Sequence, residues 1–285
     1  MQRHLRKWGA LAIAAAMALG LMGCGGGTDA QALMEQARQN MQSVNSMQMK
    51  MTMNMDMAAM GQSAQMDMVA DMAVVQSPMQ MRIEMQVSGM GESEQVQMYA
   101  KQTDGTLMMY MNDGTGWQAG ETTETELQSQ MQQADAQNYM NTFIEAATSY
   151  KAVGSETVNG VNAEKIECTI KADALATAIM ASGLEEQMSL EGADAEAVES
   201  IFEGVNDLVF TVWVEPEAAH VVKMEMDMTQ LMAQVMENLI KQAAGEQAEA
   251  LSGMIEINAL KVTIDISDIN AISEIEIPQE ALDAA

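Results

Sequence analysis

Apolar and polar residues alternate along much of this chain, most regularly over residues 47–57. Methionine stands at every odd position of that stretch. The even positions hold polar or charged side chains, namely Gln48, Lys50, Thr52, Asn54 and Asp56. A period of two is that of a β-strand with one apolar and one polar face. We therefore expect the odd residues to face a core and the even residues to face solvent.

The same alternation recurs further along the chain and predicts ten or eleven strands. The connections between them are short, which favours antiparallel neighbours. Asp104-Gly105, between alternating runs, is typical of a tight hairpin turn. The predicted strands are 47–59, 64–76, 79–88, 94–101, 107–111, two strands within 150–171, 208–215, 220–228, 254–266 and 271–277.

Helical spacing appears in four places. Near the N-terminus, Asp29 can cap a helix whose apolar face holds Leu33, Met34, Ala37, Met41 and Val44. Residues 123–149 show a helical period, and two further helical inserts are expected near 173–205 and 229–250. Strands and helices together predict an α+β fold with a single domain over residues 29–285.

The first 28 residues have the features of a secretory leader. Arg3, Arg6 and Lys7 precede a short apolar run that ends in Gly23-Cys24. This pattern resembles a bacterial lipoprotein signal, in which the chain is cleaved before a cysteine that carries acyl chains. We therefore expect a signal peptide over 1–23 and a lipidated Cys24 followed by a flexible tether to residue 28. An ordinary signal peptide with an incidental cysteine is the alternative.

Composition and charge narrow the possible functions. The chain has 285 residues with a formal net charge of -28, and its 33 methionines contrast with an aromatic content of 4%. Such a negative field repels nucleic-acid phosphates and anionic lipid headgroups, so nucleic-acid binding is not expected. Methionine is an unbranched thioether that fills irregular gaps and adapts to varied partners. A protein anchored to the cell membrane on its extracytoplasmic side fits this composition.

Few residues suggest catalysis or metal binding. The two cysteines, Cys24 and Cys168, form neither a CxxC motif nor a cluster with histidine, and His220 is the one histidine beyond the leader. Cys168 lies on the apolar side of its predicted strand, so we interpret it as a buried thiol rather than a reactive one. We therefore expect no enzyme activity, no cofactor and no conventional metal site.

Several short motifs, in their order and spacing, resemble a known group of proteins. They are the lipoprotein signal, Gly116-Trp117, GSETVNGVNAEKIE at 154–167, VWVEPEAAHVVKMEMD at 212–227 and ISEIEIPQEA at 272–281. Together they resemble the LolA/LppX-like superfamily of bacterial lipoproteins, in particular an uncharacterised branch common in Gram-positive bacteria. The resemblance implies a strongly curved antiparallel sheet, a half-open barrel, with helices on its concave face and a hydrophobic cavity between them. The helical inserts and the methionine content depart from the group, so its cargo is not transferred.

These observations lead to one main hypothesis and two alternatives. The main one is a lipid-anchored protein that binds a lipid or another hydrophobic or amphiphilic ligand in a methionine-lined cavity. The expected lining is Met47, Met49, Met51, Met53, Met55, Met57, Met66, Met68, Met72, Met79, Met81, Ile83 and Met85. The first alternative is a surface lipoprotein with a solid core that contacts other envelope proteins or a sensor. The second is Cu(I) binding by the Met-x-Met repeats, because thioethers suit this soft ion.

Overall fold

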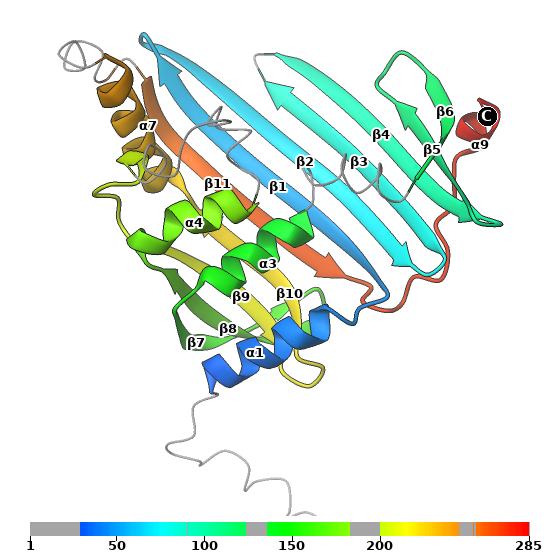
Figure 1. The fold of residues 1–285 in the computed structure, drawn as a ribbon, viewed down its shortest axis with the longest axis horizontal. Coiled ribbons are helices and arrows are strands. Elements are labelled where there is room, and N and C mark those ends of the chain that lie inside the picture. The colour runs from blue at the N-terminus through cyan, green and yellow to red at the C-terminus, as the bar shows by residue number, and fades with distance from the viewer. Residues whose placement is uncertain are drawn as a thin grey trace, which may run out of the picture.

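The computed structural model describes residues 29–89, 91–123, 136–182, 200–244, 253 and 255–284. They form one eleven-stranded antiparallel sheet with helices against it (Figure 1). This confirms the predicted α+β fold built on a single large open sheet. The strands are β1 (Ser46–Ala59), β2 (Gln62–Gln76), β3 (Met79–Gly89), β4 (Glu92–Thr103), β5 (Thr106–Asn112), β6 (Trp117–Thr122), β7 (Ser149–Val158), β8 (Val161–Ile170), β9 (Leu208–Glu215), β10 (His220–Asp227) and β11 (Ile255–Ser267).

The methionine strand β1 is the centre of the sheet. The strand order is β6-β5-β4-β3-β2-β1-β11-β10-β9-β8-β7, with five strands on each side of β1. One side is a run of consecutive hairpins from β1 to β6, and the other runs from β7 to β11. The chain therefore starts its sheet in the middle, builds one half, crosses over and returns to pair β11 with β1.

Tight turns join several of these strands, as the sequence predicts. Asp104 and Gly105, between β4 and β5, have φ angles of 52° and 82°, and Asn159 and Gly160, between β7 and β8, have 50° and 84°. Positive φ at both central residues is the geometry that matches the twist of a two-residue hairpin. The Asp-Gly prediction is thus confirmed.

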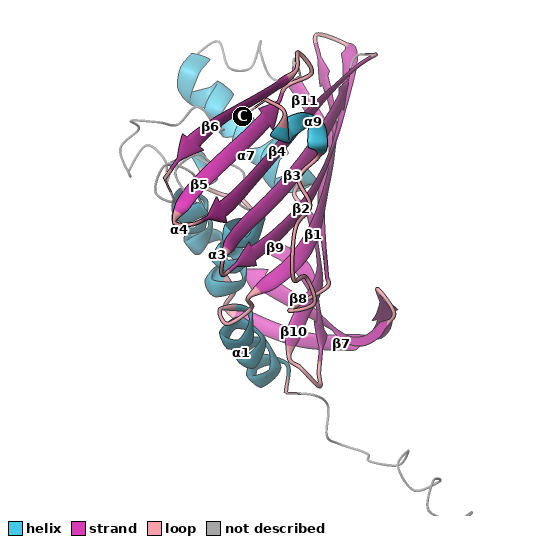
Figure 2. Cartoon of the chain, turned by 90° about the vertical axis from the view of Figure 1, so that its right-hand side faces the viewer, coloured by secondary structure: helices cyan, strands magenta, loops and turns pink. Residues whose placement is uncertain are grey.

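Four of the described helices lie on one side of the sheet (Figure 2). They are α1 (Ala30–Met41), α3 (Ala136–Ala146), α4 (Ala172–Ser182) and α7 (Thr229–Ala244). The predicted cap of α1 is present, since the Asp29 carboxylate accepts a hydrogen bond from the Ala32 N–H at 3.1 Å. None of the described helices combines the length and apolar content required to cross a membrane.

The C-terminal segment lies on the opposite face of the sheet, which the sequence did not predict. The strand expected at 271–277 is wrong, because this segment does not pair with a strand. Its backbone is held by side chains instead: Ile272 N–H donates to Ser46 Oγ at 3.1 Å, and Ile275 N–H donates to Gln80 Oε1 at 2.8 Å. The segment ends in the short helix α9 (Gln279–Leu282), whose Ala281 packs with Tyr99 and Tyr110.

The core is divided between the two faces. The main cluster joins the helix side of the sheet to residues such as Leu33 of α1, Phe143 of α3, Leu175 of α4 and Val235 of α7. Smaller clusters on the opposite face form around Tyr99 beneath α9 and around Trp213 of β9. Residues 1–28, which hold the predicted signal peptide, Gly23 and Cys24, lie outside the described residues, as do 183–199 of the first predicted insert.

Candidate functional site

The odd-numbered methionines of β1 share the helix side of the sheet. Met47 and Met49 are buried in the main core, with Met51 packed against it. The register places Met49 opposite Met72, Met53 opposite Met68, and Met55 opposite Met66 of β2. Directly opposite residues in an antiparallel pair project to the same face. The predicted assignment of odd residues to the core side is therefore confirmed.

At one end of strands β1 to β3, the apolar side chains on the helix side are part of the solid core. The five side chains concerned are Met47, Met49, Met72, Met81 and Ile83, all at most 9% exposed. Met79, at the start of β3, is half-buried and packs against the same cluster. These six predicted lining residues therefore serve as core filler, a use that an adaptable thioether side chain suits.

At the other end of the same strands, the methionines on the helix side are only half-buried. We call this region the outer methionine field. It consists of Met51, Met53, Met55, Met57, Met66, Met68 and Met85. Its strands run side by side at the centre of the sheet, so the seven side chains form one apolar group on the helix side.

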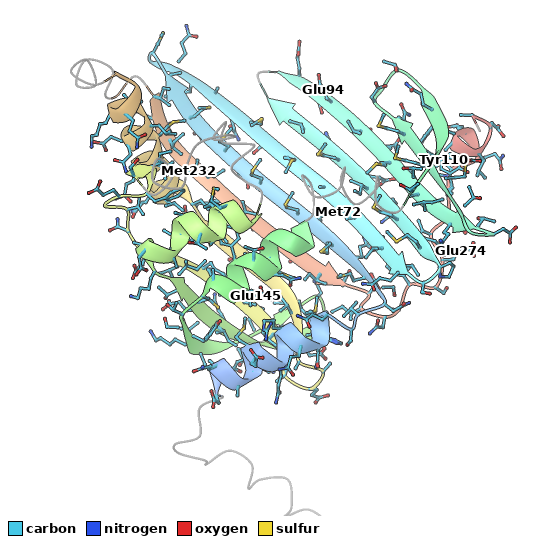
Figure 3. The ribbon with its side chains drawn as sticks, viewed as in Figure 1. Met72, Glu94, Tyr110, Glu145, Met232 and Glu274 are labelled. Atoms are coloured by element: carbon cyan, nitrogen blue, oxygen red, sulfur yellow. The ribbon has the colours of Figure 1, made fainter. Side chains whose placement is uncertain are left out.

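The described helices contact mainly one half of the sheet. Among the described residues, the main contacts between helices and the helix side of the sheet are α1 with β7, β9 and β10, α3 with β8, and α7 with β11. These helices cover the half of the sheet beyond β1 (Figure 1). Figure 3 shows Met232 on α7 near one side of the sheet and the core residue Met72 on the central strands. Strands β2 and β3 carry their share of the field outside these contacts.

The opposite face of the same strands is largely polar, apart from Ala73 and Val75 beneath the C-terminal segment. Lys50 lies opposite Asp71 on β2 and opposite Asp265 on β11. Asn54 Nδ2 donates to Asp67 at 2.7 Å, and Asn258 Nδ2 donates to Asp56 at 3.1 Å. The central strands therefore separate an apolar helix side from a charged outer side, as the alternation predicts.

A cavity of about 440 Å³ lies on that opposite face, away from the methionines predicted to line one. It is formed between the C-terminal segment and strands β4 and β5, and an ion pair of 2.7 Å between Lys101 and Glu274 crosses its wall. Its lining is Lys101, Thr103, Met108, Tyr110, Glu274, Glu276, Ile277 and Leu282. Sequence reasoning missed this cavity because it treated the C-terminal segment as a strand.

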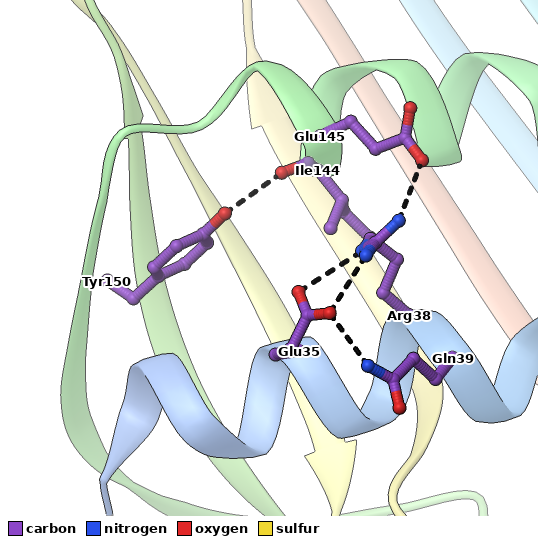
Figure 4. A network of polar contacts seen from close by, with 6 residues as sticks. All are labelled: Glu35, Arg38, Gln39, Ile144, Glu145 and Tyr150. Carbon is purple, nitrogen blue, oxygen red and sulfur yellow. Dashed lines mark hydrogen bonds and ion pairs between the residues drawn. The ribbon is translucent and has the colours of Figure 1, made fainter.

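A polar network fixes α1 against its neighbours (Figure 4). Arg38 binds Glu35 at 2.8 Å on its own helix and Glu145 of α3 at 3.2 Å. The hydrogen bond from Arg38 lowers the pKa of Glu35, with a further contribution from Gln39. Tyr150 Oη donates to the carbonyls of Ile144 and Ala147, at 3.1 Å and 3.0 Å. These contacts join α1 to α3 and the end of α3 to β7, so the network holds the helices in place.

Cys168 has the environment of an inert core thiol. It is fully buried and lies in the main core, opposite Phe210 and Tyr150. Burial, with a smaller contribution from the Glu167 charge, raises the pKa of the Cys168 thiol to about 12. A thiol that stays protonated is a poor nucleophile and a poor metal ligand. Across the described part of the chain, no three His, Cys, Asp or Glu side chains are grouped closely enough to hold a metal ion.

Trp213 is a second feature that the sequence reasoning did not single out. It is 2% exposed on the opposite face, and the amines of Lys165 and Lys223 lie 4.7 Å and 4.9 Å from its ring centre. Its Nε1 donates to Glu156 at 3.1 Å. Two cations over one ring, with the indole N–H satisfied, stabilise the β8–β10 region. The alternation around Trp213 was the available signal, since its neighbours Val212 and Val214 occupy the other face.

Comparisons with known proteins give structural similarity at low sequence identity. LprF from Mycobacterium bovis matches with 15% identity and a TM-score of 0.47, over 90% of this chain and 98% of that one. The lipoprotein LppX of Mycobacterium tuberculosis matches with 14% identity and a TM-score of 0.40, over 86% and 99%. A putative outer membrane lipoprotein-sorting protein domain from Vibrio parahaemolyticus has 10% identity and a TM-score of 0.22, over 87% and 95%.

A search of curated proteins finds no match. One family model covers residues 29–285, the range that holds all the described helices and strands. Its description is that of a family of unknown function. The chain therefore belongs to the DUF6612 family.

Proposed function

We propose that the protein is a lipid-anchored extracytoplasmic protein that binds a hydrophobic or amphiphilic ligand, such as a lipid, against the outer methionine field. The observation that carries this proposal is that the methionines on the helix side of β1 and β2 are unequally buried. Met49 and Met72 are core residues, whereas Met55 and Met66, in the same alternation, are half-buried. Contiguous apolar side chains that remain partly exposed are a feature of ligand-binding surfaces.

The chemistry of the field fits a flexible apolar chain. Burying a methylene contributes about 0.8 kcal/mol, so ten methylenes contribute roughly 8 kcal/mol. Association and ordering of the ligand cost at least about 4 kcal/mol. An acyl chain of ordinary length therefore binds with a net gain, and flexible thioethers can adjust to its shape. The activity proposed is binding, without covalent chemistry.

The anchor belongs to the same proposal. The leader ending in Gly23-Cys24 supports cleavage before Cys24 and its acylation. Two acyl chains on one residue hold a protein stably at a membrane surface. Expression of the full chain with radiolabelled palmitate tests this: label is expected on the wild type and absent from Cys24→Ala. Equal labelling and equal membrane partitioning of the two proteins would contradict the anchor.

The ligand is tested by native mass spectrometry and lipid extraction of protein purified from its own membrane. The expected result is a mass adduct that organic solvent removes and that is identified as a lipid. A fluorescent acyl probe should then bind the stripped protein in a saturable manner. A protein with no adduct and no probe binding would overturn the proposal and favour the alternative of a surface lipoprotein that contacts other envelope proteins.

A further inference from the structure

Two Met–Met pairs are consecutive on one face of the sheet at the centre of the outer methionine field. Met53 lies opposite Met68, and the next pair on the same face is Met55 opposite Met66. All four side chains are half-buried. We refer to Met53, Met55, Met66 and Met68 as the methionine quartet. We propose that the methionine quartet binds one soft monovalent metal cation, Cu(I) or Ag(I).

The spacing allows four thioethers to meet at one ion. Opposite residues in an antiparallel pair have Cβ atoms about 4.5–5.5 Å apart, and same-face neighbours along a strand are about 6.8 Å apart. The four side chains therefore start from the corners of a small rectangle. Each has three rotatable bonds and can bend its sulfur toward the centre. Three or four sulfur ligands around a small ion need no movement of the backbone.

The surroundings of the quartet select a soft ion. Across the sheet, Met53 and Met68 are flanked by Val262 and Val87, and Met55 is flanked by Leu260. These neighbours provide no oxygen or nitrogen donor. Thioether ligands favour Cu(I), whereas Ca²⁺ and Mg²⁺ require oxygen and Zn²⁺ prefers thiolate or imidazole. The quartet therefore discriminates by ligand chemistry.

The negative charge of the chain also favours a cation here. The chain carries a formal net charge of -28, and Asp56 and Asp67 lie on the other face of the same two strands. Their field attracts cations to the region without supplying a ligand to the helix side. The remaining Met–Met pair between β1 and β2, Met49 and Met72, is buried and therefore less accessible to an ion. Its neighbours across the sheet are Ile266 and Ile83.

The test uses the full chain with Cys24→Ser, because a free thiol would bind these ions more tightly than thioethers. Cys168 can remain, since it is fully buried. With methionine methyl groups labelled with ¹³C, titration with Ag(I) is expected to shift the quartet's signals at one equivalent. Cu(I) affinity is measured in parallel by competition with a colorimetric Cu(I) chelator under reducing conditions. Equal shifts of all methionine signals would overturn the proposal.

A matched pair of variants separates the quartet from general methionine content. One variant replaces the four quartet residues with leucine, which keeps the apolar volume but removes the sulfur. The control replaces four half-buried methionines outside the field, namely Met79, Met98, Met109 and Met232. Cu(I) affinity should fall at least tenfold in the first variant and less than twofold in the control, with thermal unfolding showing both folded. Equal affinities would overturn the site. The metal is added alone, so the result is independent of the proposed lipid.

Discussion

Met55 of β1 lies directly opposite Met66 of β2, and both are half-buried, whereas the equivalent pair Met49 and Met72 is only 6% and 7% exposed. The two pairs have the same sequence pattern and the same register. They differ in burial: the inner pair belongs to the main core, whereas the outer pair does not. The proposed ligand site is thus the half-buried part of these strands.

Polar substitution in the outer methionine field should weaken acyl binding. Gln has nearly the shape of Met but presents an amide that loses its water when an apolar chain covers it. The double substitution Met57→Gln and Met85→Gln is expected to weaken binding of a fluorescent acyl probe at least tenfold. Met60→Gln is the control, because Met60 is 83% exposed in the β1–β2 turn. Equal affinities in the two proteins would exclude the field as the binding surface.

The inner methionines should matter for stability instead. Met81 is 1% exposed in the main core, so Met81→Ala leaves a cavity and should lower the free energy of unfolding by about 2–5 kcal/mol. Met60→Ala should change it by less than about 0.5 kcal/mol. Urea denaturation followed by circular dichroism measures both. Similar small effects at the two positions would show that Met81 does not belong to the solid core.

The C-terminal segment should depend on one buried side chain. Gln80 is 4% exposed and accepts the Ile275 N–H, so Gln80→Leu leaves a buried donor unsatisfied at a cost of about 1–3 kcal/mol. Lys101→Met removes the partly exposed ion pair with Glu274 and should cost less than about 1 kcal/mol. Hydrogen exchange at Ile275 should accelerate in the first variant only. Unchanged protection there would contradict this role of Gln80.

The buried thiol should make stability fall at alkaline pH. The pKa of Cys168 is about 12 in the folded protein against an ordinary value of 9.0, so the folded state keeps a proton that the unfolded chain releases. Its contribution is complete below pH 9 and is lost as the pH rises toward 12, at up to about 1.4 kcal/mol per pH unit. The difference in unfolding free energy between wild type and Cys168→Ala should shrink over this window.

Tyr99, whose pKa is also raised to about 12 mainly by burial, is present in both proteins and cancels in the comparison. Native Cys168 should also resist alkylation at pH 8. Two stability curves that stay parallel from pH 9 to pH 12, or rapid alkylation of the folded protein, would show that the thiol is accessible.

Much of the fold could be predicted from local pattern. The period of two around Met47–Met57 identifies β1 and its inward face, and Asp104-Gly105 identifies a hairpin, because both depend on neighbours in sequence. The alternation of Ile275 and Ile277 with Glu274 and Glu276 gave a false strand. Backbone N–H groups of this segment donate instead to the side chains of Ser46 and Gln80, which lie about 200 residues earlier in the chain.

The burial of each methionine side chain could not be predicted in the same way. Met49 and Met55 are equivalent in periodicity, yet Met49 belongs to the main core and Met55 is half-buried. The cavity beside Lys101 also depends on the path of the C-terminal segment. Such features require the tertiary arrangement, because no local pattern encodes which half of a face is covered.

The most direct test of ligand binding at the outer methionine field is photocrosslinking. Protein freed of lipid is crosslinked to a fatty acid that carries a diazirine in its chain, and the labelled peptides are then identified by mass spectrometry. We predict crosslinks on Met51–Met57, on Met66 and Met68, and on Met85, with competition by unlabelled fatty acid. Crosslinks confined to Met108, Ile277 and Leu282 would place the ligand in the opposite-face cavity and contradict the account, as would labelling that unlabelled fatty acid does not reduce.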